Sequence, residues 1–261
     1  MSATAPTGSE CKVQAINFSF SYAYGETKAL HSLNLAIRPG SLLTIMGPTG
    51  SGKTTFLRAL NRLNDRVAGT GHTGQLLLDG KDVYGQEVDV AELRRRVGMV
   101  FALPTPLPLS IYENVAYGPR KKGIRSRAKL DTIVEKALKT AVIFEEVKDR
   151  LHSSAQRLSG GQQQRLALAR VLAVDPEVIL LDEPTSGLDP LSTLRIEETL
   201  RQLRSDFTIV LVTHDPLQAA RIKSDVAFFY LGELVEIGPA TEIFTRPQDR
   251  RTEDYITGKF G

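Results

Sequence analysis

The chain has 261 residues, of which 41% are hydrophobic and 24% charged, a composition typical of a folded protein with a sizeable core. Its 33 basic and 30 acidic residues nearly cancel, so the charge does not favour nucleic acid as a partner. The single cysteine excludes an internal disulfide, and no apolar run approaches the roughly 18–20 residues that cross a bilayer.

The N-terminal part of the chain changes character after its first ten residues. Residues 1–10 are small and polar, and we predict a disordered leader there, followed by one folded domain over residues 11–261. The first apolar runs of that domain are Ala15–Phe20, Leu33–Ile37 and Gln75–Leu78. We expect these runs to be strands of an antiparallel layer.

Residues 47–54 match the phosphate-binding pattern G-x-x-x-x-G-K-[ST] at every fixed position, between an apolar strand-like run and a helix-like run. The glycines let backbone N–H groups converge on phosphate oxygens, and the N-terminus of the following helix favours an anion. We expect Lys53 to pair with the β- and γ-phosphates and the Thr54 hydroxyl to bind Mg²⁺. The predicted ATP-binding residues of this loop are Gly47, Pro48, Thr49, Gly50, Ser51, Gly52, Lys53, Thr54 and Thr55.

A helical region is predicted after the strand-like run Val97–Phe101, since strand signals are scarce over residues of about 103–173. Near its end, Ser159 precedes two glycines and a helical run, which is the pattern of an N-cap and a helix start. This is a second helix terminus that favours an anion. Because the first one already holds the nucleotide of its own chain, the second is free to serve another chain.

Two further strand-like runs end in polar residues that suit catalysis. Val178–Leu181 is followed by Asp182 and Glu183, at the strand end where doubly wound sheets bind ligands. We expect Asp182 to hold Mg²⁺ and Glu183 to act as the general base toward water. The next run ends in His214, which we expect to contact the γ-phosphate or Glu183.

The C-terminal part contains a hairpin-like pair, Val226–Leu231 and Glu233–Ile237, around Gly232. A short helix is predicted at Thr241–Arg246, and the residues Thr252–Gly261 read as a polar tail. We expect no further domain.

The octet Leu158–Arg165 lies between the phosphate loop and Asp182-Glu183, and with these motifs the chain resembles the ATPase subunits of ATP-binding-cassette (ABC) transporters. The resemblance implies a P-loop NTPase cassette of the α/β class, with a RecA-like core, an antiparallel β layer and an inserted α-helical subdomain. It also implies a homodimer that encloses two Mg·ATP. The family's signature residues, here Ser159, Gly160, Gly161 and Gln162, would then contact the partner's ATP. Asp189, in the D-loop segment Ser186–Asp189, would line the interface, and Tyr24 would stack on adenine.

Within this family the chain is most similar to the ATPase subunits of bacterial phosphate importers of the Pst type. The similarity rests on residues 104–118, Lys148–His152, Gln162–Gln164, Tyr230–Leu234 and Thr252–Gly258. It implies a catalyst of ATP hydrolysis, with Lys53, Glu183 and His214 as catalytic residues, that powers the import of inorganic phosphate. The implied partners are two integral membrane permease subunits and a separate phosphate-binding protein, at the cytoplasmic face of the inner membrane.

One position departs from the family pattern. Ala102 occupies the place where the family normally has a glutamine that touches Mg²⁺ and the attacking water and links the site to the membrane subunits. We expect ATP binding to survive this change, and the turnover rate or its dependence on the membrane subunits to be altered.

Three alternatives stay open at this point. In the first, the transported cargo would be another oxyanion or a small solute. In the second, the chain would be a soluble ABC ATPase that acts on nucleic acid or ribosomes. Such proteins usually carry two cassettes or a long coiled-coil insert, and this sequence has neither, so it favours the second alternative less. The third concerns Tyr24, which would be an ordinary aromatic residue at a strand edge instead of a residue that stacks on adenine.

Overall fold

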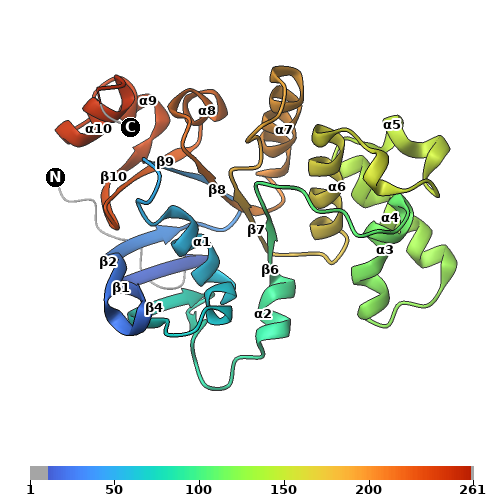
Figure 1. Ribbon diagram of the computed structural model, residues 1–261, viewed down its shortest axis with the longest axis horizontal. Coiled ribbons are helices and arrows are strands. Elements are labelled where there is room, and N and C mark those ends of the chain that lie inside the picture. Colours follow the sequence, from blue (N-terminus) through green and yellow to red (C-terminus); the bar gives the residue numbers. More distant parts are fainter. Residues whose placement is uncertain (1–10, 260–261) are drawn as a thin grey trace.

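The computed structural model describes residues 11–259, so the predicted leader at 1–10 lies outside the described part. The molecule contains two sheets (Figure 1). The first is antiparallel, with the strand order β2-β1-β4-β5. Its strands are β1 (Val13–Tyr22), β2 (Thr27–Ile37), β4 (Gly71–Leu78) and β5 (Lys81–Asp82). The predicted antiparallel layer is therefore confirmed.

The second sheet has the strand order β10-β9-β3-β8-β7-β6, in which β10 is antiparallel to β9 and the other five strands run parallel to one another. Its strands are β3 (Leu42–Met46), β6 (Val97–Val100), β7 (Val178–Asp182), β8 (Thr208–Thr213), β9 (Asp225–Tyr230) and β10 (Glu233–Pro239). Every residue of β3, β7 and β8 is buried. Parallel strands covered on both faces require such continuous apolar runs, so the sequence pattern predicts these strands.

The helices fall into two groups (Figure 1). Around the sheets lie α1 (Lys53–Leu60), α2 (Val90–Arg96), α7 (Pro190–Leu203), α8 (Pro216–Ile222), α9 (Ala240–Ile243) and α10 (Arg250–Ile256). On the far side of β6 lie α3 (Ile111–Lys121), α4 (Arg127–Thr140), α5 (Phe144–Val147) and α6 (Gly160–Leu172). Over residues 11–259 no helix combines the length and the apolarity needed to cross a membrane.

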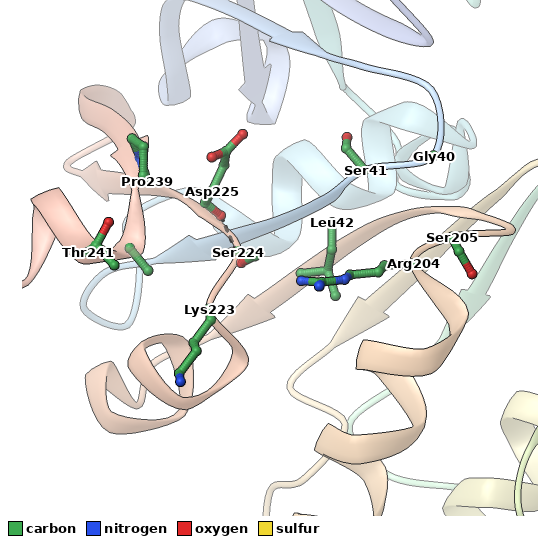
Figure 2. A pocket seen from close by; sticks show the side chains of 11 residues that line it. Gly40, Ser41, Leu42, Arg204, Ser205, Lys223, Ser224, Asp225, Pro239 and Thr241 are labelled. Atoms are coloured by element: carbon green, nitrogen blue, oxygen red, sulfur yellow. Dashed lines mark hydrogen bonds between the residues drawn. The ribbon is translucent and has the colours of Figure 1, made fainter.

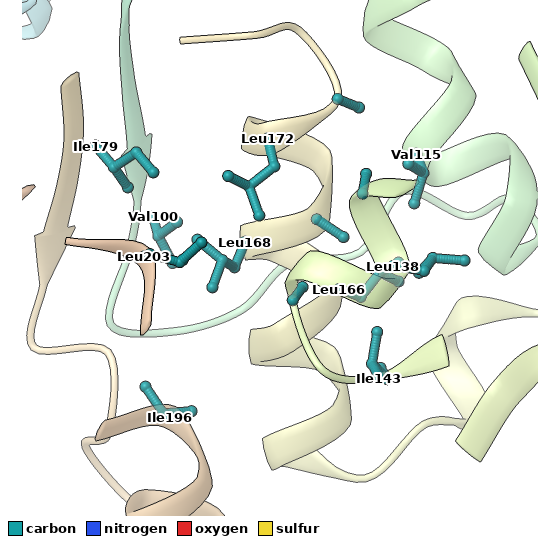
Figure 3. Packing of buried hydrophobic residues seen from close by; sticks show 14 of the residues in the cluster. Val100, Val115, Leu138, Ile143, Leu166, Leu168, Leu172, Ile179, Ile196 and Leu203 are labelled. Atoms are coloured by element: carbon teal, nitrogen blue, oxygen red, sulfur yellow. The ribbon is translucent and has the colours of Figure 1, made fainter. Parts of the chain in front are cut away.

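The second group of helices shares its core with the parallel sheet. One buried apolar cluster runs from Val100 and Ile179 in the sheet, through Leu168 of α6, to Val115 and Leu138 of the outer helices (Figure 3). Burying a leucine or valine side chain contributes about 1.5–3 kcal/mol, so α6 is held strongly from both sides. Between β6 and β7 the chain forms helices and loops with one isolated antiparallel bridge, Ser110 to Ser154, and the boundary of about 103–173 stays a prediction because the core is continuous across it.

The predicted polar tail, Thr252–Gly261, is helical over residues 252–256, which belong to α10. The Asp249 side chain accepts hydrogen bonds at the start of this helix, and Thr252 and Tyr255 are buried against the rest of the molecule. Two buried positions in a helix of seven residues give no usable apolar period, so the sequence signal was too weak to detect.

Candidate functional site

The phosphate loop connects the end of β3 to the start of α1 and packs closely against neighbouring backbone. Gly47 has φ 150°, and a Cβ there would lie 2.0 Å from the Phe229 carbonyl oxygen. Gly52 has φ 94°, and a Cβ there would lie 2.6 Å from the Ala29 carbonyl oxygen. Both positions therefore require glycine. The loop residue Gly50 is exposed and faces open space, so the backbone there is accessible to a ligand.

Lys53 is the first residue of α1, and its side chain is almost entirely buried. Its Nζ donates hydrogen bonds to the carbonyl oxygens of Gly47 and Pro48, each at 2.7 Å. Burial lowers the pKa of Lys53, and the nearby carboxylates of Glu183 and Asp182 oppose this effect. A buried cation held mainly by neutral carbonyls would gain from an anion, so the geometry suits phosphate.

The next residue of α1 joins the phosphate loop to the end of β7. The Thr54 hydroxyl donates to Asp182 Oδ1 at 2.8 Å, and Asp182 is 6% exposed. Burial raises the pKa of Asp182, so a cation beside it would favour its ionised form. Hydroxyl and carboxylate oxygens are suitable ligands for Mg²⁺, which takes its remaining ligands from phosphate and water. Among residues 11–259 no group of three or more acidic, histidine or cysteine side chains forms a metal cage.

Ser51 adds a second indication that a ligand belongs in the loop. Its hydroxyl oxygen is buried and makes no hydrogen bond within the described residues. An unsatisfied buried polar group is costly unless a ligand or water completes it.

Glu183 turns away from Asp182 because its backbone is left-handed. Its φ is 47°, a conformation that costs a non-glycine residue of order 1–3 kcal/mol, and its N–H donates to the Val212 carbonyl at 2.9 Å. Its carboxylate Oε2 lies 3.0 Å from Nδ1 of His214, which follows the neighbouring strand β8. The strained turn thus places a partly exposed carboxylate beside an exposed imidazole, where water can reach it.

The cavity at this site is small. It measures about 170 Å³ and is lined by residues 49–55, Ala29 and Glu183. Sites that enclose a whole drug-sized ligand measure about 300–1,000 Å³, so this cavity suits the phosphates alone. Tyr24, in the short helix η1 (Ala23–Gly25), is 90% exposed, and its backbone N–H donates to the Gly69 carbonyl at 2.7 Å. It presents a free ring face to solvent, and its predicted stacking on adenine stays a prediction.

The predicted signature residues form the start of α6. Ser159 and Gln162 cap the helix reciprocally: the Ser159 hydroxyl accepts from the Gln162 N–H at 3.3 Å, and Gln162 Oε1 accepts from the Ser159 N–H at 3.1 Å. Gly160 is exposed, whereas Gly161 is buried so closely against Ser192 that a Cβ would lie 2.4 Å from its hydroxyl oxygen.

Asp189 caps α7 beside this point. It accepts hydrogen bonds from the N–H of Ser192 at 2.9 Å and from its hydroxyl at 2.6 Å, and these bonds lower the pKa of Asp189. Gly161 and Asp189 thus meet at one residue, Ser192. The start of α6 and the D-loop are therefore packed against the same residue.

The sequence did not predict that an arginine of α6 would be buried and paired with a glutamate. Arg165 of α6 is 2% exposed and forms two hydrogen bonds to Glu146 at 2.7 and 3.0 Å. Glu146 also accepts from the Gln162 side chain at 2.9 Å and from Arg195 of α7 at 3.0 Å. These contacts lower the pKa of Glu146, the largest effect being the hydrogen bond from Arg165. Residues distant in the sequence therefore fix the direction of the signature helix.

A second unpredicted network links the loops after β7 and β8. Gln218 of α8 donates to the Thr185 hydroxyl at 2.7 Å and to Glu197 of α7 at 3.4 Å. Glu197 is fully buried and is paired with Arg221 at 2.7 Å. The loops that carry Glu183, Asp189 and His214 are thus joined through buried side chains.

Ala102, the position that departs from the family pattern, lies after β6 and is half-buried, and its methyl group cannot take the role of the glutamine that the family normally has there. The neighbouring carbonyl of Phe101 accepts a hydrogen bond from the buried Gln164 side chain at 2.9 Å. Gln164 belongs to α6, so the segment after β6 is tied to the signature helix through backbone. Gln164 Oε1 is itself buried without a hydrogen bond in the described residues.

A further pocket of about 410 Å³ lies at the opposite ends of the parallel strands (Figure 2). Residues such as Leu42 and Asp225, at the starts of β3 and β9, line it together with Arg204 and Lys223. Doubly wound sheets bind ligands at the carboxyl ends of their strands. The phosphate loop, Asp182 and His214 are at those ends, and this pocket is not.

Comparison with known proteins gives consistent results. A family model described as ABC transporter matches residues 30–186. The phosphate import ATP-binding protein PstB 3 of Streptococcus pneumoniae is 53% identical over 238 residues, which are 91% of this chain and 95% of that protein. The structure of cbiO1 from Clostridium perfringens, part of the ABC transporter complex cbiONQ, has a TM-score of 0.79 at 26% identity and covers 96% of this chain and 97% of its own. A bacterial Atm1-family ABC exporter with ATP bound has a TM-score of 0.79 at 28% identity, covering 99% of this chain and 44% of the exporter chain.

Proposed function

The chain belongs to the ABC transporter family, and from this premise we propose that it is the ATP-hydrolysing subunit that powers the import of inorganic phosphate through a membrane permease. The 53% identity to a phosphate import ATP-binding protein, over nearly the full length of both chains, carries the choice of phosphate. The chain itself would not contact the transported ion. It would act with two permease subunits and a separate phosphate-binding protein, at the cytoplasmic face of the inner membrane.

The catalytic roles are divided between neighbouring side chains. Lys53 binds the β- and γ-phosphates in exchange for its two carbonyl partners. Glu183 accepts a proton from the attacking water, and His214, 3.0 Å from its carboxylate, orients that carboxylate. Mg²⁺, when bound to Thr54 and Asp182, would offset the charge that develops on the phosphate oxygens.

The second surface of the site comes from another copy of the chain in this proposal. The phosphate cavity of about 170 Å³ leaves much of a nucleotide uncovered, and the exposed start of α6 offers helix N–H groups that suit an anion. Two copies related by a two-fold axis would each present Ser159 and Gly160 to the nucleotide held by the other. ATP binding would close this dimer and hydrolysis would open it.

The test is radiolabelled phosphate uptake at limiting concentration, in cells whose other phosphate importers are deleted, with the native chain or with Lys53→Ala. We expect uptake to collapse in the variant, since the phosphate loop loses its cation. Sulfate uptake in the same cells is the control. Unchanged phosphate uptake would contradict phosphate as the cargo, and a purified chain without ATPase activity would contradict the enzymatic role.

A further inference from the structure

The helix α10 contacts the His214 loop and packs beside the end of β3, where the phosphate loop begins. The Tyr255 hydroxyl donates a hydrogen bond to the backbone carbonyl oxygen of His214 at 2.7 Å. The ring of Tyr255 belongs to the same buried apolar cluster as Met46, the last residue of β3, which directly precedes the phosphate loop. One side chain from α10 therefore holds the backbone of the His214 loop by its hydroxyl and packs by its ring beside the residue that precedes the phosphate loop.

Tyr255 is held firmly in this position. It is 5% exposed, and its ring lies 5.1 Å from the ring of Phe228, centroid to centroid, in a small apolar cluster that includes Met46 at the end of β3. Burial is the main reason that the pKa of Tyr255 rises to about 12, so the hydroxyl keeps its proton and remains a donor at any physiological pH. The ring supplies the packing beside Met46, and the hydroxyl supplies the contact with the His214 loop.

The His214 segment depends on such contacts for its shape. The Asp215 N–H donates to the Thr213 hydroxyl at 3.0 Å, and the Asp215 side chain caps α8, so the residues on both sides of His214 are fixed by local bonds. The carbonyl of His214 is instead fixed from α10. Because the imidazole reaches Glu183 by a single contact of 3.0 Å, a small rotation of the His214 backbone would break that contact.

We propose that Tyr255 is a positioning residue for ATP hydrolysis, which sets the His214 backbone relative to the phosphate loop and so keeps the imidazole against Glu183. This inference rests on the proposed function, since it presupposes that Glu183 and His214 act in hydrolysis. Tyr255 touches neither the nucleotide nor the attacking water in this proposal. Its effect should therefore appear in turnover rather than in ATP affinity.

The test compares Tyr255→Phe with Tyr112→Phe in the purified full-length chain. Tyr112 is a matched control, because it is 3% exposed and its hydroxyl donates at 2.7 Å to Asp131, in the helical region far along the chain from the site. We expect kcat to fall roughly two- to twelve-fold in Tyr255→Phe, the range that the loss of one ordinary hydrogen bond corresponds to. The dissociation constant for ATP should change less than twofold, and Tyr112→Phe should keep the wild-type kcat.

A double-variant comparison separates positioning from general destabilisation. In a His214→Ala background, Tyr255→Phe should have no further effect on the residual rate, because the group through which it acts is absent. The ring resonances of His214, identified by their loss in His214→Ala, should also shift in Tyr255→Phe but not in Tyr112→Phe. Equal losses in both tyrosine variants, or independent multiplication with His214→Ala, would overturn the proposal.

The ATPase activity of the wild-type chain distinguishes a failure of the Tyr255 proposal from a failure of the proposed function. If the wild-type chain hydrolyses ATP and Tyr255→Phe matches it in kcat, the positioning role is wrong and the proposed function stands. If the wild-type chain does not hydrolyse ATP, both are wrong.

Discussion

Asp182 and Glu183 are adjacent carboxylates in very different surroundings. Asp182 ends β7 and is buried against the Thr54 hydroxyl, whereas the left-handed backbone of Glu183 directs its side chain toward His214. The two residues therefore suit different tasks, one toward a metal ion and the other toward water. Environment rather than residue type separates the roles.

Replacing Glu183 by glutamine tests the assignment of the general base. Glu183→Gln keeps the size of the side chain and removes its ability to take a proton, so we expect kcat to fall about 10²–10⁴-fold. ATP binding should persist, because Lys53 and Thr54 are unchanged. Phosphate release and the binding of a fluorescent ATP analogue measure the two effects. Hydrolysis near the wild-type rate would remove Glu183 from this role.

Ala102 offers a test in the opposite direction, by restoring a residue. Ala102→Gln would place an amide in the segment that Gln164 ties to the signature helix through the Phe101 carbonyl. We expect ATP affinity to stay within about twofold, while the turnover rate or its stimulation by the permease changes, because an amide can reach Mg²⁺ and water where a methyl group cannot. ATPase measurements on the purified chain and on the assembled transporter give both values. An unchanged rate with unchanged stimulation would show that Ala102 has no functional consequence.

At the scale of elements, the sequence predicted the loops and strands that are encoded by a few consecutive residues. The phosphate loop lies within eight consecutive residues, and the strands before Asp182 and His214 are continuous apolar runs, so both could be located without a structure. The fold class followed from the same motifs and is confirmed. The predicted binding and metal-ligating roles of these residues stay predictions.

Contacts between distant elements could not be predicted in the same way. Gln218 meets Glu197 only because α7 and α8 pack together, and Tyr255 meets His214 only because α10 folds back over 41 residues. Each is a single polar residue on a helix, without a period or motif of its own. Tertiary packing decides their partners, and a single sequence does not contain that information directly.

The two sheets are joined by charged side chains, which leads to a pH prediction. Glu177, just before β7, is paired with Arg96 at the end of α2 and with Lys12 near the start of β1. The hydrogen bond from Arg96 is the largest cause of the fall in the pKa of Glu177 to about 2. Because the pKa is lower in the folded state, this contribution to stability is complete above the ordinary value of 4.5 and is lost as the pH falls toward 2.

Glu177→Gln copies the protonated state of this group and so tests the linkage. We expect the variant to have a lower melting temperature than the wild type at pH 7, and the difference to shrink as the pH is lowered from 5 to 3. The exposure of the carboxylate limits the size of the effect, since solvent screens such pairs. Thermal unfolding at matched ionic strength measures it. A difference independent of pH would assign the loss to packing rather than to charge.

At the scale of the whole molecule, the phosphate loop and the start of α6 lie apart in one chain, and in the proposed dimer they would form the two halves of each site. The phosphate cavity is lined by residues 49–55, Ala29 and Glu183, and no residue of α6 lines it. Gly161 of α6 packs instead against Ser192, the residue that also binds Asp189 of the D-loop. A site that takes one half from each of two copies would explain why both halves are exposed.

Mixing two inactive variants tests whether the halves come from different copies. Lys53→Ala disables the phosphate loop, and Gly160→Asp places a carboxylate at the exposed start of α6, where it would repel phosphate. In a mixed dimer both defects fall in the same site, so the other site, built from the intact loop of one copy and the intact helix of the other, stays whole. Equal mixing makes about half of the dimers mixed, each with one of two sites intact, so we expect the mixture to recover about a quarter of the wild-type ATPase rate. If each chain used its own helix, every site would carry a defect and the mixture would stay as inactive as either variant alone.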